Sequence, residues 1–259
     1  MNKGTFLFLG SGGSLGIPVV GCDCEVCRSH SPHNHRLRPS GLIRVAGKRI
    51  MVDCGPDFRE QALRYHINTL DGLILTHSHN DHVAGIDELR IYSMRNHQPL
   101  PCLLSQETAD DIKKRYFYIF EKSSIPNKVT ARLDLQQFPS DRGEVNFLGQ
   151  KIKYVTYEQC GMGVNGFVIG NLAYMSDIKI YPETIFEDIQ GVDQLIISAL
   201  RFTPSDFHFT VDEAIDFSKK VGAKKTWLTH IAHELDHEKT NAYLPANIQL
   251  AYDGLEIAW

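Results

Sequence analysis

The chain has 259 residues, of which 42% are hydrophobic, enough to bury a sizeable core in one large domain. Its 31 acidic and 27 basic residues give a formal net charge of −4, which argues weakly against a nucleic-acid surface. No apolar run approaches the ~20 residues of a membrane span, and the first residues, MNKGTFLFLGSGG, lack the apolar core of a signal peptide. We therefore expect one cytoplasmic domain over residues 1–259.

Strand-like and helix-like patterns alternate along the chain. We expect, in order, a strand at 5–10, a hairpin at 42–53, a helix at 56–66, a strand within 70–79 that ends in a histidine-rich loop, helices at 81–95 and 105–122, short strands with a hairpin at Gly170-Asn171 over 144–176, a strand at 194–200, a helix at 210–222 and a strand at 225–231. The helix at 210–222 has the clearest ends, with a capping box from Thr210 to Glu213 and a stop at Gly222. Long β stretches with interspersed helices predict a layered α/β fold with its chemistry at strand ends.

Three cysteines are clustered near the start of the chain. The stretch VGCDCEVCRSH places Cys22, Cys24 and Cys27 within six residues. A closed tetrahedral zinc site takes four protein ligands, so this cluster predicts most of a metal site that lacks one ligand. The remaining cysteines are scattered, which suits reduced thiols rather than a disulfide framework.

A second group of ligand-type residues lies in the stretch LTHSHNDHVAG. His77 and His79 are two residues apart on extended chain, so both imidazoles can point to one side. Asp81 and His82 follow where the chain turns into a helix. Four potential ligands within six residues can serve two adjacent metal ions.

Two further patterns favour less specific interpretations. The stretch GSGGSLG after the first strand lacks the third glycine of a dinucleotide-binding loop, so we interpret it as a loop that lines a phosphate pocket. His30, His33 and His35 lie in SHSPHNHRLRPS, whose proline and arginine residues indicate a flexible loop rather than a metal site.

The order His-x-His-x-Asp-His after a buried strand resembles the metallo-β-lactamase superfamily, and the resemblance covers essentially the whole chain. It implies an αββα sandwich of two mixed β-sheets flanked by helices, with a dinuclear metal site. VDCG resembles an earlier motif of the family, which places Asp53 behind the metal ligands. YMSDI and LTHI resemble the strands that end in the bridging aspartate, Asp177, and in the last metal histidine, His230.

The resemblance also implies how these residues share two ions. His77 and His79 would bind one ion, Asp81, His82 and His230 would bind the other, and Asp177 would bridge them. Carboxylate and imidazole ligands suit zinc or manganese.

The cysteine cluster, with a histidine just past the last metal ligand, resembles the PhnP-type cyclic-phosphate phosphodiesterases within this superfamily. That resemblance implies a structural zinc ion bound by Cys22, Cys24, Cys27 and His233, with His237 as the rival fourth ligand. A metal could supply the ordering energy of this loop, which has no periodic pattern of its own.

Further site residues follow from the phosphodiesterase branches. A histidine at the start of the capped helix, here His208, serves there as an acid or phosphate-binding group, and we expect it to protonate the leaving oxygen. Asp81 is predicted to be catalytic as well as a metal ligand. Arg201 could contact a phosphate or form a surface ion pair.

One departure from the superfamily pattern is visible. A third histidine normally binds the first ion, but YVTYEQCGMGVNGFVIG contains none, and His97 is the only histidine between His82 and Asp177. Cys160 and Glu158 are the candidate replacements, and the alternative is a weakened or empty first site. The free-bending Gly161-Met162-Gly163 run favours the absence of a direct replacement.

These observations predict a metal-dependent phosphodiester hydrolase that acts on a small cyclic or nucleotide-like phosphodiester through a metal-bound hydroxide. The alternatives are a nuclease of the tRNase Z or exonuclease kind and a PqqB-like accessory protein with a weakened metal site. We expect the protein to bind a small phosphodiester, with nucleic acid as the less favoured partner, and not to bind a membrane. A homodimer is compatible with the sequence.

Overall fold

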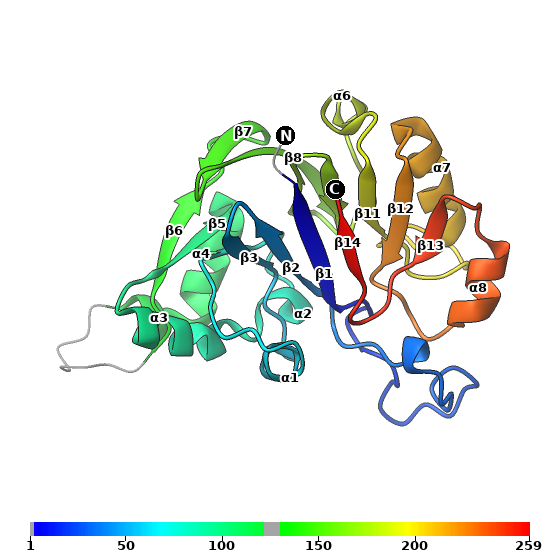
Figure 1. The fold of residues 1–259 in the computed structure, drawn as a ribbon, viewed down its shortest axis with the longest axis horizontal. Helices are drawn as coiled ribbons and strands as arrows, with labels where there is room; N and C mark the ends of the chain where they lie inside the picture. The colour runs from blue at the N-terminus through cyan, green and yellow to red at the C-terminus, as the bar shows by residue number, and fades with distance from the viewer. Residues whose placement is uncertain (1–2, 122–129) are drawn as a thin grey trace.

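The computed structural model describes residues 3–121 and 130–259, and within these ranges the chain forms two seven-stranded β-sheets (Figure 1). The first sheet has the order β14-β1-β2-β3-β4-β5-β6 and the second the order β13-β12-β11-β10-β9-β8-β7. Helices lie on the outer side of each sheet (Figure 1). The predicted αββα sandwich is therefore confirmed.

The strands have the following bounds. The first sheet contains β1 (Gly4–Gly10), β2 (Ser40–Val45), β3 (Lys48–Val52), β4 (Gly72–Ile74), β5 (Leu100–Leu104), β6 (Leu133–Gln137) and β14 (Glu256–Ala258). The second sheet contains β7 (Arg142–Phe147), β8 (Gln150–Gln159), β9 (Met162–Ile169), β10 (Leu172–Met175), β11 (Gln194–Ser198), β12 (Lys225–Thr229) and β13 (Ile248–Leu250).

The helices are short. They are α1 (Phe58–Arg64), α2 (Asn80–Val83), α3 (Arg90–Asn96), α4 (Gln106–Arg115), α5 (Phe117–Phe120), α6 (Ile185–Ile189), α7 (Val211–Val221) and α8 (His237–Tyr243), with 3-10 turns η1 (Pro32–Asn34) and η2 (Ile86–Leu89). Within residues 3–121 and 130–259, each helix is too short or too polar to cross a bilayer.

The core has three layers that follow from strand alternation. One lies between the two sheets, and one lies between each sheet and its helices. Phe6 and Phe8 point between the two sheets, where they join Phe147 and Phe167. Leu7 packs on the opposite face, beneath the helices of the first sheet. Because both faces of β1 are covered, the strand is apolar at nearly every position, as the sequence pattern indicated.

Several predicted elements are confirmed. The hairpin at 42–53 forms β2 and β3, and the hairpin at Gly170-Asn171 joins β9 to β10. The helix predicted at 56–66 is present as α1. Helix α7 has the capping box from Thr210 to Glu213 and ends at Gly222, whose φ is 67°.

Two helix predictions were wrong in extent. The helix predicted at 81–95 is divided into α2, η2 and α3. Gly85 causes the break, because its N–H donates to the Cys54 carbonyl at 2.8 Å and a β-carbon there would lie 2.3 Å from the Gly55 carbonyl oxygen. The helix predicted at 105–122 is divided into α4 and α5, and Lys122 lies outside the described residues.

Candidate metal centre and active site

The predicted ligands converge at one edge of the sandwich because they follow the ends of strands from both sheets. His77 and His79 lie in the loop after β4, Asp177 lies two residues past the end of β10, and His230 directly follows β12. Asp177 and His230 have left-handed φ values of 53° and 57°, as does Asp53 after β3, with 57°. Left-handed backbone at non-glycine residues is costly and concentrates at functional sites.

The first two histidines face each other. Thr76 Oγ1 has a single proton, which it donates to Asp53 Oδ2 at 2.9 Å, so it accepts the proton of His77 Nδ1 at 3.0 Å. The lone pair of His77 Nε2 therefore points toward His79 Nδ1, 2.9 Å away. Burial, followed by the charge of His82, lowers the pKa of His77, so its imidazole is neutral and available as a ligand.

Two carboxylates and two imidazoles form the adjoining half of the centre. His82 Nε2 lies 3.2 Å from Asp177 Oδ2 and 3.4 Å from Asp81 Oδ2. His230 Nε2 lies 3.2 Å from Asp177 Oδ1 and 3.3 Å from Asp81 Oδ2. Both oxygens of Asp177 are thus in contact with imidazoles of this half, and Asp177 also shares a group of ligand-type atoms with His77 of the other half.

Asp53 orients these ligands from behind, as the resemblance implied. Its Oδ2 lies 2.7 Å from His82 Nδ1, and its Oδ1 accepts the backbone N–H of Thr76 at 2.8 Å. A carboxylate on the outer nitrogen of a metal-binding histidine holds the ring orientation and raises its basicity. His82 Nε2 is consequently directed into the centre, where it is buried and has no hydrogen-bond partner among the described residues.

The electrostatics of the centre fit cations. Burial disfavours charge at His82, but the carboxylates of Asp81, Asp53 and Asp177 outweigh it and raise the pKa of His82. Burial opposes ionisation of Asp177, but His230 and His82 hold its pKa well below the usual range. Ligand-type atoms lie within 4.8 Å of one another in the groups His77, His82 and Asp177, and Asp81, His82 and His230. Buried carboxylates surrounded by imidazole nitrogens fit divalent metal ions by number and type.

A cavity of about 320 Å³ opens over these groups, and His208 forms part of its wall. The His208 ring stacks on His230 with centroids 4.8 Å apart, and its Nδ1 lies 3.4 Å from Asp177 Oδ1. Burial, followed by the charge of His230, lowers the pKa of His208 to about 4. The structure therefore brings the predicted acid to the predicted metal ligands.

The glycine-rich loop also reaches this cavity. Ser14 lines it, and a β-carbon on Gly13 would lie 3.3 Å from His230 Nδ1. Arg201 instead donates from Nη1 to Glu234 Oε1 at 3.3 Å, so the ion-pair alternative describes its position in the structure.

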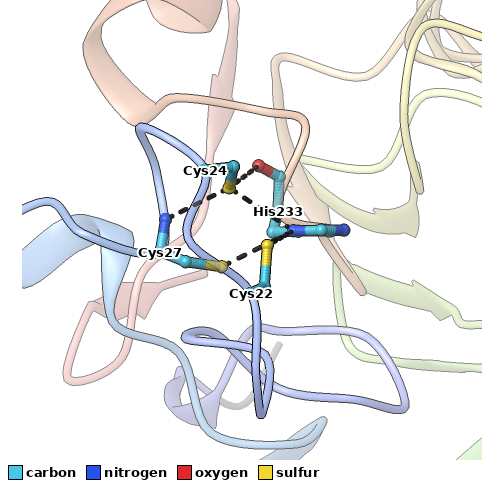
Figure 2. A group of neighbouring side chains, drawn as sticks. All are labelled: Cys22, Cys24, Cys27 and His233. Atoms are coloured by element: carbon cyan, nitrogen blue, oxygen red, sulfur yellow. Dashed lines mark hydrogen bonds between the residues drawn. The ribbon is translucent and has the colours of Figure 1, made fainter.

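The cysteine cluster forms a separate group with His233 (Figure 2). The sulfur atoms of Cys22, Cys24 and Cys27 lie 3.2, 3.5 and 3.5 Å from His233 Nδ1. The backbone N–H of Cys27 donates to Cys24 Sγ and lowers the pKa of the Cys24 thiol to about 6, whereas burial raises the pKa of Cys27 to about 11. Three sulfurs and one nitrogen that face one another fit a tetrahedral zinc site.

The rival fourth ligand lies elsewhere. His237 Nδ1 is 3.1 Å from the Arg36 guanidinium, and its ring lies against His33 with centroids 4.5 Å apart. His33, His237 and the exposed Glu238 form a third group of ligand-type atoms, but a glutamate at the surface is common without a metal.

The chain is similar to known proteins in both sequence and fold. A family model described as "Beta-lactamase superfamily domain" matches residues 48–231. The chain belongs to the β-lactamase superfamily. The solved structure of "a New Diphosphatase from the PhnP Family" is similar at a TM-score of 0.92 and 36% identity, covering 100% of this chain and 98% of that one.

Two curated proteins with similar sequences have names other than diphosphatase. An "Octanoyltransferase" of Porphyromonas gingivalis is 37% identical over 255 residues, which are 96% of this chain and 50% of that protein. A "Ribonuclease Z" of Bradyrhizobium diazoefficiens is 45% identical over 60 residues, 22% of this chain and 20% of that protein. The chain thus spans about half, or less, of the curated relatives it matches. Membership of the superfamily confirms the predicted enzyme class, a metal-dependent hydrolase.

The sequence pattern named Glu158 and Cys160 as candidates for the position of the missing superfamily histidine, but it did not single out Gln159, which lies between them. Glu158 and Cys160 are both exposed, and Cys160 lies at the wall of the cavity, whereas Gln159 between them lines the same cavity and is only 2% exposed. Side chains alternate along a strand, so the buried Tyr157 and Gln159 share a face of β8 and Glu158 points away. That alternation was the signal that could have identified Gln159.

Proposed function

We propose that this chain is a metal-dependent phosphodiester hydrolase that acts on a small cyclic or nucleotide-like phosphodiester. The observation that carries the proposal is the placement of His208 in one cavity with the ends of His79, Asp81, Asp177 and His230. A proton donor beside two sets of metal ligands is the constellation that hydrolysis of a phosphate ester needs.

Under this proposal, His77, His79 and Asp177 hold one ion, and Asp81, His82, His230 and Asp177 hold the other. A pair of divalent ions, zinc or manganese, would lower the pKa of a water molecule and neutralise charge on the phosphoryl oxygens. Cys22, Cys24, Cys27 and His233 would hold a structural zinc ion.

The chain's own residues would orient the reaction. Asp81 and Asp177 position the imidazoles by direct contact. His208, neutral in the free cavity because its pKa is lowered to about 4, would face an anionic phosphodiester. An opposite charge within a few ångströms favours the protonated imidazole, so His208 would hold a proton for the leaving oxygen.

Two features support a small substrate over a polynucleotide. The cavity of about 320 Å³ is at the small end of ligand pockets, and the formal net charge of −4 gives no excess of positive charge for a nucleic-acid backbone. The relative of 36% identity is named a diphosphatase, so a diphosphate is the second candidate substrate for the same centre. Octanoyl transfer is not proposed, since the relative of that name is twice as long as the match.

The test is hydrolysis of bis-para-nitrophenyl phosphate by protein loaded with zinc or with manganese. We expect turnover that disappears with a chelator, and stronger competition by a cyclic ribose phosphate than by a short oligonucleotide. A linear diphosphate as the best competitor would favour the second candidate, and an oligonucleotide would favour the nuclease. Full metal content without any hydrolysis would contradict the proposal and favour a PqqB-like accessory role. The single domain over 1–259, the cytoplasmic location and the oligomeric state stay predictions.

A further inference from the structure

We propose that the side-chain amide of Gln159 replaces the missing imidazole and supplies its oxygen as a ligand to the ion held by His77, His79 and Asp177. This inference rests on the metal centre of the proposed function, but on no particular substrate.

The backbone directs Gln159 into the centre. It is the last residue of β8, and its neighbour Glu158 exchanges two backbone hydrogen bonds with Ile180, of 2.8 and 3.0 Å. These bonds and the pairing of Gln159 with Met162 fix the orientation of the strand end. The side chain of Gln159 therefore points inward, and those of Glu158 and Cys160 are exposed.

The nitrogen of the amide is already occupied. Gln159 Nε2 lies 3.3 Å from Asp177 Oδ1 and 3.1 and 3.2 Å from the two ring nitrogens of His208. The amide is thus in contact with the carboxylate predicted to bridge the ions and with the predicted acid.

The oxygen of the amide is not occupied. Gln159 Oε1 is buried and has no hydrogen-bond partner among the described residues. A buried acceptor without a partner is unfavourable, and native proteins satisfy nearly all of them. Gln159 shares its cavity with His79, whose Nδ1 faces the lone pair of His77 Nε2. A cation bound by Gln159 Oε1, His77 Nε2 and His79 Nδ1 would satisfy the amide oxygen and both imidazoles together.

The chemistry of the ligand predicts a property of the site. An amide oxygen is neutral and harder than an imidazole nitrogen, so it favours manganese over zinc more than a histidine would. The ion held by His77, His79, Asp177 and Gln159 should accordingly exchange more easily than its neighbour, which has a second carboxylate in place of the neutral amide. It should also select manganese more strongly than a site with a third imidazole would.

The experiment is a manganese titration of metal-stripped full-length protein in which electron paramagnetic resonance counts the free ion, so that no turnover is needed. We expect two sites in the unaltered protein, and in Gln159→Leu one of them weakened by ~10-fold or more. Gln159→Glu keeps the side-chain length and adds charge, so it should tighten the same site. Gln159→His should shift that site toward zinc in a competition between the two metals.

Glu158→Gln is the matched control, because it changes the exposed neighbour and should leave both sites as they are. The zinc content of the cysteine cluster and the melting temperature report on folding of each variant. Two unchanged manganese sites in folded Gln159→Leu, or in Gln159→Glu if the leucine variant does not fold, would overturn the inference. Two manganese sites that respond to Gln159, with no phosphodiester hydrolysis, would leave the inference standing and defeat the proposed function.

Discussion

The cysteine cluster and the histidine–aspartate centre lie close together, since His233 follows His230 by three residues, yet they are built differently. Three of the four atoms of the cluster come from one six-residue loop, and all three sulfurs face a single nitrogen of His233 (Figure 2). The other centre takes its residues from the ends of strands in both sheets, and it opens to a cavity that holds His208.

This difference has a chemical consequence. Four protein ligands around one zinc ion leave no open position, so the cluster can contribute folding energy but no bound substrate. In the centre the imidazoles are oriented by Asp53 and Thr76, and one side stays accessible through the cavity. Under the proposed function, the closed set of thiolates and one imidazole would serve a structural purpose, and the open set of imidazoles and carboxylates would serve a catalytic one.

The largest effect should come from removing the carboxylate that both halves of the catalytic centre share. Asp177→Ala should lower phosphodiester hydrolysis by ~10³-fold or more, because the metal ions stabilise the transition state by several kcal/mol and each 1.36 kcal/mol is tenfold in rate. Elemental analysis should show loss of the exchangeable ions while one zinc ion stays bound. Asp193→Ala removes a carboxylate paired with Lys224 at the start of β11 and is the control. Hydrolysis at the unaltered rate would contradict the role of Asp177.

A smaller effect is expected at the wall of the cavity. His208→Ala should reduce turnover by ~10²–10⁴-fold with nearly unchanged metal content, since general acid catalysis typically contributes that much. The control is His35→Ala, which removes an exposed histidine that contacts the Ser29 carbonyl. His208 also forms a group of ligand-type atoms with Asp177 and His230, so equal losses of metal and activity would show that it is a ligand instead.

The smallest effect on catalysis should follow from opening the closed site. Cys24→Ser should lose the zinc ion and lower the melting temperature by roughly 8–16 °C, if the ion contributes about 4 kcal/mol as a ligand at a thousand times its dissociation constant does. Turnover of the folded variant should stay within a few-fold of the unaltered protein. Cys160→Ser, an exposed thiol outside the cluster, should keep both zinc and melting temperature. Loss of hydrolysis in folded Cys24→Ser would show that the two sites are coupled.

The features that the sequence predicted well are those with local causes. The spacing of His77, His79 and Asp81 along one loop, and of the three cysteines along another, is set by a few residues of chain. The ends of α7 follow from Thr210, Glu213 and Gly222, all within its own turns. Such patterns can be predicted from the sequence because the interacting groups are neighbours in the chain.

The features that needed the tertiary structure have causes far away in the sequence. The break in the helix predicted at 81–95 depends on the approach of Gly85 to Gly55, about thirty residues earlier. The choice of His233 over His237 depends on how the loop after β12 meets the cysteine loop more than two hundred residues before it.

Gln159 shows most clearly which features the sequence determines and which the tertiary structure decides. By itself, the sequence determined that no histidine stands between His97 and Asp177, and strand alternation determined that Tyr157 and Gln159 share a face. Only the tertiary structure decided that this face points at Asp177 and His208, because the pairing of β8 with β9 and with Ile180 sets the direction of the strand end. An alternating pattern specifies which side chains lie together, but the arrangement of the strands within the second sheet decides which other residues they meet.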